Sequence, residues 1–288
     1  MKNSQVLQST KPTVLRVSNE QVSLNVKVYG IENPETIILL HGGPGVPDDM
    51  PFVAEAIKNK YQVVYFDQRG TRLSACKNHS YTMANYLSDI ELIANELGLE
   101  QFHLFGHSWG GLYAQIYAEE YPHRILSLFL CSPGSGTNKI WKQTEKEVML
   151  FNKKACTKRE WFAMGWNSLW GILGSNRAYQ KLFATVIRNY SKGFTNLTLQ
   201  YDLSHINAEP INKTRPQIIK YPLLQVSTPS PFPVMITYGD QDIYGNSKQE
   251  VFKRYPNAQR KTIQHCGHIP WHNNSQTFRD VLATFYAI

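Results

Sequence analysis

The pentapeptide G-H-S-W-G at residues 106–110 lies between a short apolar run, 102–105, and a helical pattern that starts at Trp109. A serine in a tight turn between a strand and a helix has its hydroxyl exposed at the end of the strand. Glycines on both sides suit this turn, because residues without side chains let the strand and the helix come close together. The pattern predicts a nucleophilic serine at Ser108. The alternative is a serine that only caps the helix.

A serine hydroxyl is a weak nucleophile by itself, so this motif predicts an acid and then a histidine further along the chain. The acid is expected after a late strand, and the apolar run 234–238 is followed by G-D-Q-D at 239–242. Two residues, Asp240 and Asp242, therefore compete for this position.

The histidine is expected after the next strand, where 260–264 leads into a segment with His265, His268 and His272. The Gly-His pair at 267–268 favours His268, which would take the proton from the serine and later protonate the leaving group. His265 and His272, together with Cys266, also permit a metal site. No established zinc spacing fits them, so we expect no metal and place both histidines at the surface or behind the site.

Donors for a tetrahedral oxyanion are expected from a glycine-rich turn, and H-G-G-P-G at 41–45 follows the buried-strand run 36–40. Gly43 is the candidate for the first backbone N–H, with Gly42 as the alternative. The second is the N–H of Trp109, the residue after the nucleophile. Loss of one such donor costs about 3 kcal/mol in the transition state. Without the other motifs, an ordinary glycine turn would be the favoured explanation of this segment.

Four segments in this order resemble the proline iminopeptidase branch of the α/β-hydrolase superfamily: H-G-G-P-G at 41–45, D-Q-R-G at 67–70, G-H-S-W-G-G at 106–111 and G-D-Q-D at 239–242. The resemblance spans roughly residues 20–133 and 230–288. It implies a cofactor-free serine peptidase that releases an N-terminal residue, typically proline, from short peptides. The G-x-x-D spacing usual in the superfamily selects Asp242. Arg72 stands where the family usually has a glycine, which brings the local turn geometry into question.

The remaining pattern predicts an α/β fold. Short apolar runs typical of buried parallel strands occur at 36–40, 62–66, 102–105, 125–131, 233–238 and 260–264. Helical patterns occur at 51–58, 84–97, 109–121, 246–254 and 275–286. We expect the α/β-hydrolase fold, with a mostly parallel doubly wound sheet formed by 1–133 and 231–288 and the site at the carboxyl ends of the strands. Residues 134–230 break the alternation and predict an inserted, mainly helical cap.

The predicted cap is rich in tryptophan. Trp161, Phe162, Trp166 and Trp170 recur near helical spacing and predict one aromatic stripe. Such a stripe is typical of a helix that packs against a core, here against the sheet domain. Alternatively, part of it, with Trp161 and Trp166 as candidates, roofs a pocket for a proline ring or another apolar group.

The cap also carries the charge of the chain. It has 14 Lys and Arg against 5 Asp and Glu, whereas the rest of the chain has 16 and 17. An aminopeptidase must bind a cationic α-amine, and Glu209, beside Pro210 in a segment without a helical pattern, is the best candidate in the cap. The basic surface either solubilises exposed helices, or favours an anionic substrate, or contacts an acidic lipid or partner. No nucleic-acid-binding module is recognisable, so we expect no nucleic acid partner.

Three functions fit these observations. The first is an aminopeptidase of proline iminopeptidase type acting on a short peptide. The second is an esterase, lactonase or amidase acting on a small-molecule substrate, and the third is a non-catalytic ligand-binding protein of the same fold. No apolar run reaches 18 residues, residues 1–10 lack the apolar stretch of a signal peptide, and the four cysteines have no framework spacing. We therefore expect a cytoplasmic protein without a transmembrane segment; the sequence does not specify its oligomeric state.

Overall fold

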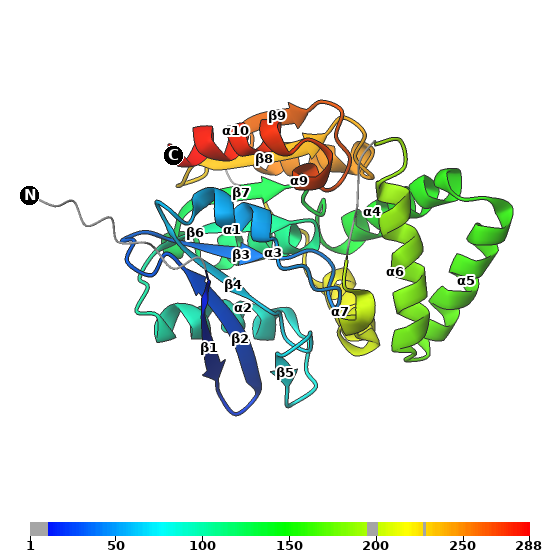
Figure 1. Cartoon of the computed structure of the whole chain (residues 1–288), viewed down its shortest axis with the longest axis horizontal. Helices are drawn as coiled ribbons and strands as arrows, with labels where there is room; N and C mark the ends of the chain where they lie inside the picture. The colour runs from blue at the N-terminus through cyan, green and yellow to red at the C-terminus, as the bar shows by residue number, and fades with distance from the viewer. Residues whose placement is uncertain (1–10, 195–200, 227–228) are drawn as a thin grey trace, which may run out of the picture.

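The structure is a computed structural model that describes residues 11–194, 201–226 and 229–288. Residues 1–10, on which the expected absence of a signal peptide rests, lie outside the described residues. Within these ranges the strands form one nine-stranded sheet in the order β1-β2-β4-β3-β6-β7-β8-β9, with β5 paired to β2 (Figure 1). The strands are β1 (Thr13–Ser18), β2 (Val22–Tyr29), β3 (Thr36–Leu40), β4 (Gln62–Phe66), β5 (Ala75–Cys76), β6 (Phe102–His107), β7 (Ile125–Cys131), β8 (Val234–Gly239) and β9 (Gln259–Ile263).

The sheet is antiparallel at one edge and parallel elsewhere. β1, β2 and β4 pair antiparallel, whereas each neighbouring pair from β4 through β3, β6, β7 and β8 to β9 is parallel. The central parallel strands are almost entirely buried and apolar, as expected of strands covered on both faces. The predicted α/β-hydrolase fold, with its mostly parallel sheet and helical insertion, is confirmed.

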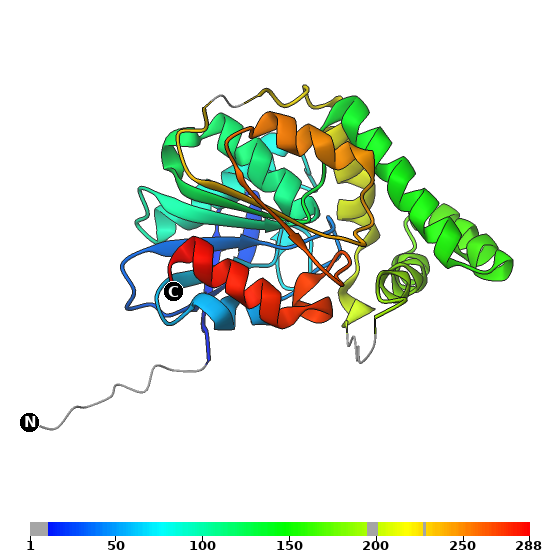
Figure 2. The same cartoon turned by 90° about the horizontal axis from the view of Figure 1, so that it is seen from above.

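Helices cover both faces of the sheet (Figure 2). α2, α3 and α8 pack into the core on one face, and α1, α9 and α10 pack into the core on the other. Their bounds are α1 (Pro51–Ile57), α2 (Met83–Glu96), α3 (Trp109–Glu120), α8 (Gln249–Arg254), α9 (Pro270–Asn273) and α10 (Ser275–Tyr286). Short 3₁₀ turns lie at Pro122–Arg124, Leu203–His205 and Asn246–Lys248.

The chain between β7 and β8 forms a helical insertion. Its helices are α4 (Asn138–Ala155), α5 (Lys158–Ile172), α6 (Asn176–Tyr190) and α7 (Ala208–Lys220). Figure 2 shows α4 and α5 projecting beyond the sheet domain. No helix in the described part of the chain combines the length and apolar character needed to cross a membrane.

At Arg72 the backbone adopts the conformation that a glycine would favour. Its φ is +42°, in the left-handed region, where most side chains are disfavoured. Its guanidinium donates to Asp49 (Nη1 to Oδ1, 2.5 Å) and lies 3.9 Å from Oδ1 of Asp67. The loop therefore keeps a positive φ at this position, and the arginine adds a charge contact across it.

Candidate active site

Ser108 lies in the turn between β6 and α3. Its φ of +55° and ψ of −117° are strained for a residue with a side chain. The flanking glycines leave no room for a Cβ: one added at Gly106 would lie 2.3 Å from the carbonyl oxygen of Gly110. One added at Gly110 would lie 2.1 Å from the carbonyl oxygen of Leu40. The G-x-S-x-G spacing is therefore a requirement of close packing between β3, β6 and α3.

His268 connects Ser108 to Asp242. Its Nε2 lies 2.9 Å from Oγ of Ser108, and its Nδ1 lies 3.0 Å from Oδ1 of Asp242. Oδ2 of Asp242 accepts a hydrogen bond from the hydroxyl of Ser132 (2.6 Å), and Oδ1 also accepts from the N–H of Tyr244 (3.3 Å). Burial raises the pKa of Asp242, but the charge of His268 and these hydrogen bonds outweigh it and hold the pKa below its usual value.

A second histidine supports this arrangement. Burial lowers the pKa of His107 to about 3, so its imidazole is neutral. Its Nε2 lies 2.9 Å from the backbone carbonyl of His268, to which the protonated nitrogen donates. Its ring also packs against Trp271, with the centroids 4.7 Å apart. His107 thus fixes the backbone of His268, a role that the sequence did not indicate.

The alternative candidates for the acid and the histidine lie apart from Ser108. Asp240 is exposed, and its Oδ1 accepts the backbone N–H of Cys266 (2.9 Å). His265 is exposed at a φ of +50°, and His272 packs against Tyr201, with the ring centroids 5.6 Å apart. In the described ranges no group of three or more His, Cys, Asp or Glu is arranged to hold a metal ion.

The predicted oxyanion donors lie beside Ser108. Gly43 and Trp109 line the same cavity as Ser108. Trp109 is the first residue of α3, so its N–H has no acceptor within the helix. Gly43 has a φ of +55°, and a Cβ there would lie 2.8 Å from Cβ of Val46. Gly42 remains the alternative, since a Cβ there would lie 3.2 Å from Cβ of Ser108.

A buried network holds together the two segments that carry the predicted oxyanion donors. Nε2 of Gln68 donates to the carbonyl of His41 (2.9 Å), and its Oε1 accepts from the indole N–H of Trp109 (2.9 Å). Next along the chain, Arg69 forms a bidentate ion pair with Asp89, with N···O distances of 2.7 and 2.8 Å. The D-Q-R-G segment thus positions the H-G-G-P-G turn and the start of α3.

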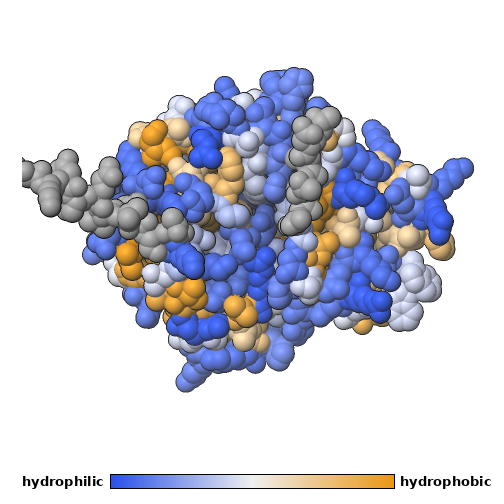
Figure 3. All heavy atoms as spheres, in the orientation of Figure 1, coloured by the Kyte–Doolittle hydropathy of each residue, from blue (hydrophilic) through white to orange (hydrophobic). Residues whose placement is uncertain are grey.

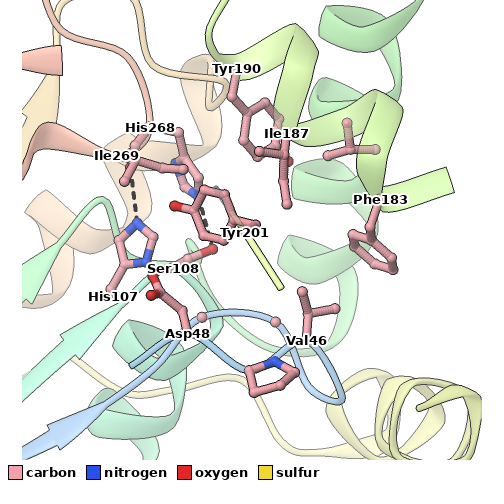
Figure 4. A pocket seen from close by; sticks show the side chains of 14 residues that line it. Val46, Asp48, His107, Ser108, Phe183, Ile187, Tyr190, Tyr201, His268 and Ile269 are labelled. Carbon is pink, nitrogen blue, oxygen red and sulfur yellow. Dashed lines mark hydrogen bonds between the residues drawn. The ribbon is translucent and has the colours of Figure 1, made fainter. Parts of the chain in front are cut away.

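Two cavities meet at Ser108. The larger, of about 580 Å³, extends into the insertion and has mainly apolar walls from α4, α5 and α6, including Val148, Trp161 and Val186. The smaller, of about 100 Å³, contains Asp48. Figure 4 shows Asp48 and Ser108 in the smaller cavity, with Tyr190 on its opposite wall.

Two polar residues near the serine were not predicted. Burial raises the pKa of Asp48 to about 6, although its carboxylate accepts the N–H of Met50 (3.2 Å). The hydroxyl of Tyr244 lies 3.3 Å from Oγ of Ser108. Asp48 lies three residues after the H-G-G-P-G segment. This short distance from a predicted site motif is the signal in the sequence that could have placed Asp48 near Ser108.

The three predicted substrate residues of the cap differ in whether they line a cavity at Ser108. Trp161 lines the larger cavity, but Trp166 is 55% exposed and is not part of either wall. Glu209 lies in the first turn of α7, not in a non-helical segment, and its carboxylate bonds to His79, Tyr81 and Lys213 away from both cavities. The expectation of a non-helical segment is therefore wrong, and Glu209 lines neither cavity at Ser108.

The prediction that the aromatic stripe packs against the sheet domain is wrong. Trp161 faces the cavity, whereas Phe162, Trp166 and Trp170 face solvent. The reason is geometric, because successive residues of a helix point about 100° apart and the described residues cover α5 on one side only. The stripe therefore divides into one inward and three outward side chains, and none of the outward three packs onto the sheet domain.

Comparison with known proteins agrees with this fold. The family model described as the alpha/beta hydrolase fold matches residues 35–274. A proline iminopeptidase of Lactobacillus delbrueckii subsp. bulgaricus is 25% identical over 269 residues, which cover 86% of this chain and 88% of the relative. A carboxylesterase from Bacillus subtilis has a TM-score of 0.67 at 15% identity and covers 96% of this chain and 92% of its own. A proline iminopeptidase from Mycobacterium smegmatis has a TM-score of 0.67 at 18% identity, covering 95% and 97%. The chain belongs to the α/β-hydrolase fold family.

Proposed function

We propose that this protein is a serine hydrolase that cleaves carboxylic esters or amides of an apolar acyl group. One observation above all supports this: Ser108, hydrogen-bonded to His268, opens onto a largely apolar cavity of about 580 Å³. Asp242 completes a serine, histidine and aspartate series with distances of 2.9 and 3.0 Å. Such a series activates a hydroxyl that is otherwise a weak nucleophile.

The reaction would proceed in two steps. In the first, Oγ of Ser108 bonds to the carbonyl carbon while Nε2 of His268 takes the hydroxyl proton. The N–H groups of Gly43 and Trp109 stabilise the oxyanion, and His268 returns the proton to the leaving alcohol or amine as its bond to carbon breaks. In the second step a water molecule repeats the sequence, which releases the acid and restores Ser108. Asp242 keeps Nδ1 of His268 protonated and stabilises the imidazolium.

The charges around the larger cavity support this substrate class. Of the acidic residues that the structure describes in the insertion, Glu145 alone lines the larger cavity. Its two oxygens pair with the guanidinium of Arg215 at 2.5 and 2.8 Å, so its charge is already compensated. A cavity with compensated charge and apolar walls favours an uncharged, apolar acyl group over a free amine.

A substrate panel tests this proposal. We expect p-nitrophenyl butyrate and octanoate to be cleaved faster than the p-nitroanilides of free proline, alanine and leucine. A fluorophosphonate should label the wild type, and Ser108→Ala should lose both labelling and turnover while keeping its melting temperature. Persistent labelling of the Ser108→Ala variant would contradict the assignment of the nucleophile.

A second candidate function, an aminopeptidase, is supported by Asp48. Its carboxyl group lines the smaller cavity together with Ser108 and His268, and it comes from the core domain rather than from the cap. Two relatives named above are proline iminopeptidases. In this case Asp48, and not Glu209, would bind the α-ammonium group of the substrate.

Acetylation of the substrate amine separates the two candidates. If Asp48 binds an ammonium group, N-acetylation of proline anilide and Asp48→Asn should each lower kcat/KM at least a hundredfold, since an unpaired buried charge costs about 3–5 kcal/mol. Asp49→Asn is the matched control, because Asp49 pairs with Lys27 and Arg72 and does not line the cavities. Equal turnover of free and acetylated anilides would rule out the aminopeptidase.

A further inference from the structure

The outward side of α5 is apolar although it faces solvent. Five large apolar side chains, four on α5 and one on its C-cap residue, are spaced i, i+4, i+7, i+8 and i+11, the spacing of a stripe that normally faces a core. They are Phe162, Trp166, Leu169, Trp170 and Leu173, and their exposed fractions lie between 46% for Trp170 and 76% for Phe162. We call these five residues the outer face of α5.

The opposite side of α5 is already occupied. Trp161, Met164, Gly165 and Ser168 line the larger cavity. Further along, Gly171 lies so close to the ring of Tyr179 that an added Cβ would be 2.3 Å from it. The helix therefore cannot turn its outer face inward without destroying the cavity wall. Exposed apolar patches of this kind mark interaction surfaces.

Positive charge lies at one end of this face. Four exposed basic residues lie at the turn between α4 and α5: Lys153, Lys154, Lys158 and Arg159. No carboxylate in the described ranges forms an ion pair with any of these four within 4.0 Å. Nearby Glu160 is already paired with Arg188 at 2.7 Å and bound to the N-cap residue Thr157. In Figure 3, orange and pale spheres lie among blue ones at the end of the molecule that carries α5.

We propose that the outer face of α5 docks on an anionic lipid surface. Tryptophan and phenylalanine favour the boundary between headgroups and acyl chains, and helices that bind there combine such residues with lysine and arginine. The basic turn adds attraction to anionic headgroups. A second copy of this chain is a poorer occupant. In a parallel pair the two basic turns would meet, and in an antiparallel pair each would face residues 172–177, which include Arg177 and no carboxylate. The charge pattern therefore assigns the face to lipid.

Docking has a consequence for the cavity, which rests on the proposed function. Met149 of α4, 49% exposed, and Gly165 of α5, also exposed, both line the larger cavity. The cavity thus reaches the surface on the same two helices that carry the outer face and the basic turn. An apolar ester would enter from the lipid and reach Ser108 along apolar walls.

Vesicle sedimentation tests the docking without any turnover, so its result is independent of the proposed hydrolase activity. Wild type should sediment with vesicles of equal phosphatidylcholine and phosphatidylglycerol, and at least tenfold less with pure phosphatidylcholine. The triple variant Phe162→Ser, Trp166→Ser, Trp170→Ser should lose at least tenfold in partitioning. Lys153→Glu with Lys154→Glu should lose binding to anionic vesicles by a similar factor.

The matched control replaces equally exposed apolar residues of the sheet domain. Val14→Ser, Ile31→Ser and Leu73→Ser together should leave partitioning within twofold of the wild type. Absence of wild-type binding to anionic vesicles, or unchanged binding of the α5 triple variant, overturns the proposal. So does a dimer, measured by analytical ultracentrifugation, that the α5 triple variant dissociates, because a second copy would then cover the face.

Discussion

Replacing Asp242 by asparagine tests the relay from Ser108 in detail. Oδ1 of Asp242 faces two donors, Nδ1 of His268 and the N–H of Tyr244, whereas Oδ2 faces the hydroxyl of Ser132. A hydroxyl both donates and accepts, so it can turn and accept from an amide. The asparagine side chain of the Asp242→Asn variant would therefore keep its oxygen toward His268 and direct its NH₂ group to Ser132. The tautomer of His268 is retained, and only the negative charge is lost.

The magnitude follows from that charge. Two unit charges about 4 Å apart attract by about 4 kcal/mol at an effective dielectric constant of about 20. Asp242→Asn should therefore lower kcat about a thousandfold, at about 1.4 kcal/mol for each factor of ten. Asp242→Ala, which removes the oxygen as well, should be at least tenfold less active than Asp242→Asn, because nothing then orients the imidazole.

The assay is kcat for p-nitrophenyl butyrate, with the melting temperature of each variant as the check on folding. Asp240→Asn is the matched control and should stay within about threefold of wild type, since Asp240 is exposed and accepts backbone N–H groups of the turn at His265 and Cys266. Equal loss in the asparagine and alanine variants of Asp242 would refute the retained tautomer. A larger loss from Asp240→Asn than from Asp242→Asn would refute the choice between the two aspartates.

Three further predictions concern stability, and urea unfolding measures each of them. Gly110→Ala should cost about 3 kcal/mol or more, since its Cβ would lie 2.1 Å from a backbone oxygen of β3, whereas Gly165→Ala, with open space around it, should cost nothing. Asp89→Ala should cost about 3–5 kcal/mol by leaving the buried Arg69 unpaired; a loss below 1 kcal/mol would contradict this. For Asp48 the pKa in the folded protein, about 6, lies above the unfolded value, so its stabilising effect is complete below about pH 4 and is lost as the pH rises through 6. Asp48→Asn should therefore gain about 1 kcal/mol or more relative to wild type between pH 4 and 7.5, and a constant difference would contradict the raised pKa.

The features that could be predicted from the sequence are those that local packing of the backbone requires. The strand, turn and helix around Ser108 followed from glycines, because each glycine marks a place where a Cβ would meet backbone atoms 2.1–2.3 Å away. The same reasoning was incomplete at Arg72, where contacts with Asp49 and Asp67 accompany a positive φ that a glycine would adopt without strain. Local sequence indicates which backbone conformation is needed, and long-range contacts decide which side chains can accept it.

The sequence could not predict which side of a cap helix faces inward. α5 has apolar residues all around, so its periodicity does not distinguish Trp161, on the cavity wall, from its neighbour Phe162, in solvent. Contacts of α5 with α6 and α7 make that choice, and those with α7 join distant residues, such as Asn212 and Gly171, 41 positions apart. Glu209 was misplaced for the same reason, since its partners His79 and Tyr81 lie about 130 residues away.

In the helical insertion, the unpaired basic residues lie on the surface and not on the walls of the larger cavity. Their position limits which molecules they can attract. At the larger cavity, the exposed Arg215 is paired with Glu145 beside apolar walls, so these two charges compensate each other. On the surface, the lysines at the α4–α5 turn have no carboxylate partner among the described residues and border the outer face of α5. Exposed charges are screened within about 8–10 Å at physiological salt, so they act on whatever touches that surface and not on the reacting bond. Selection of an uncharged acyl group within the cavity and attraction to an anionic surface outside it are therefore compatible in one chain.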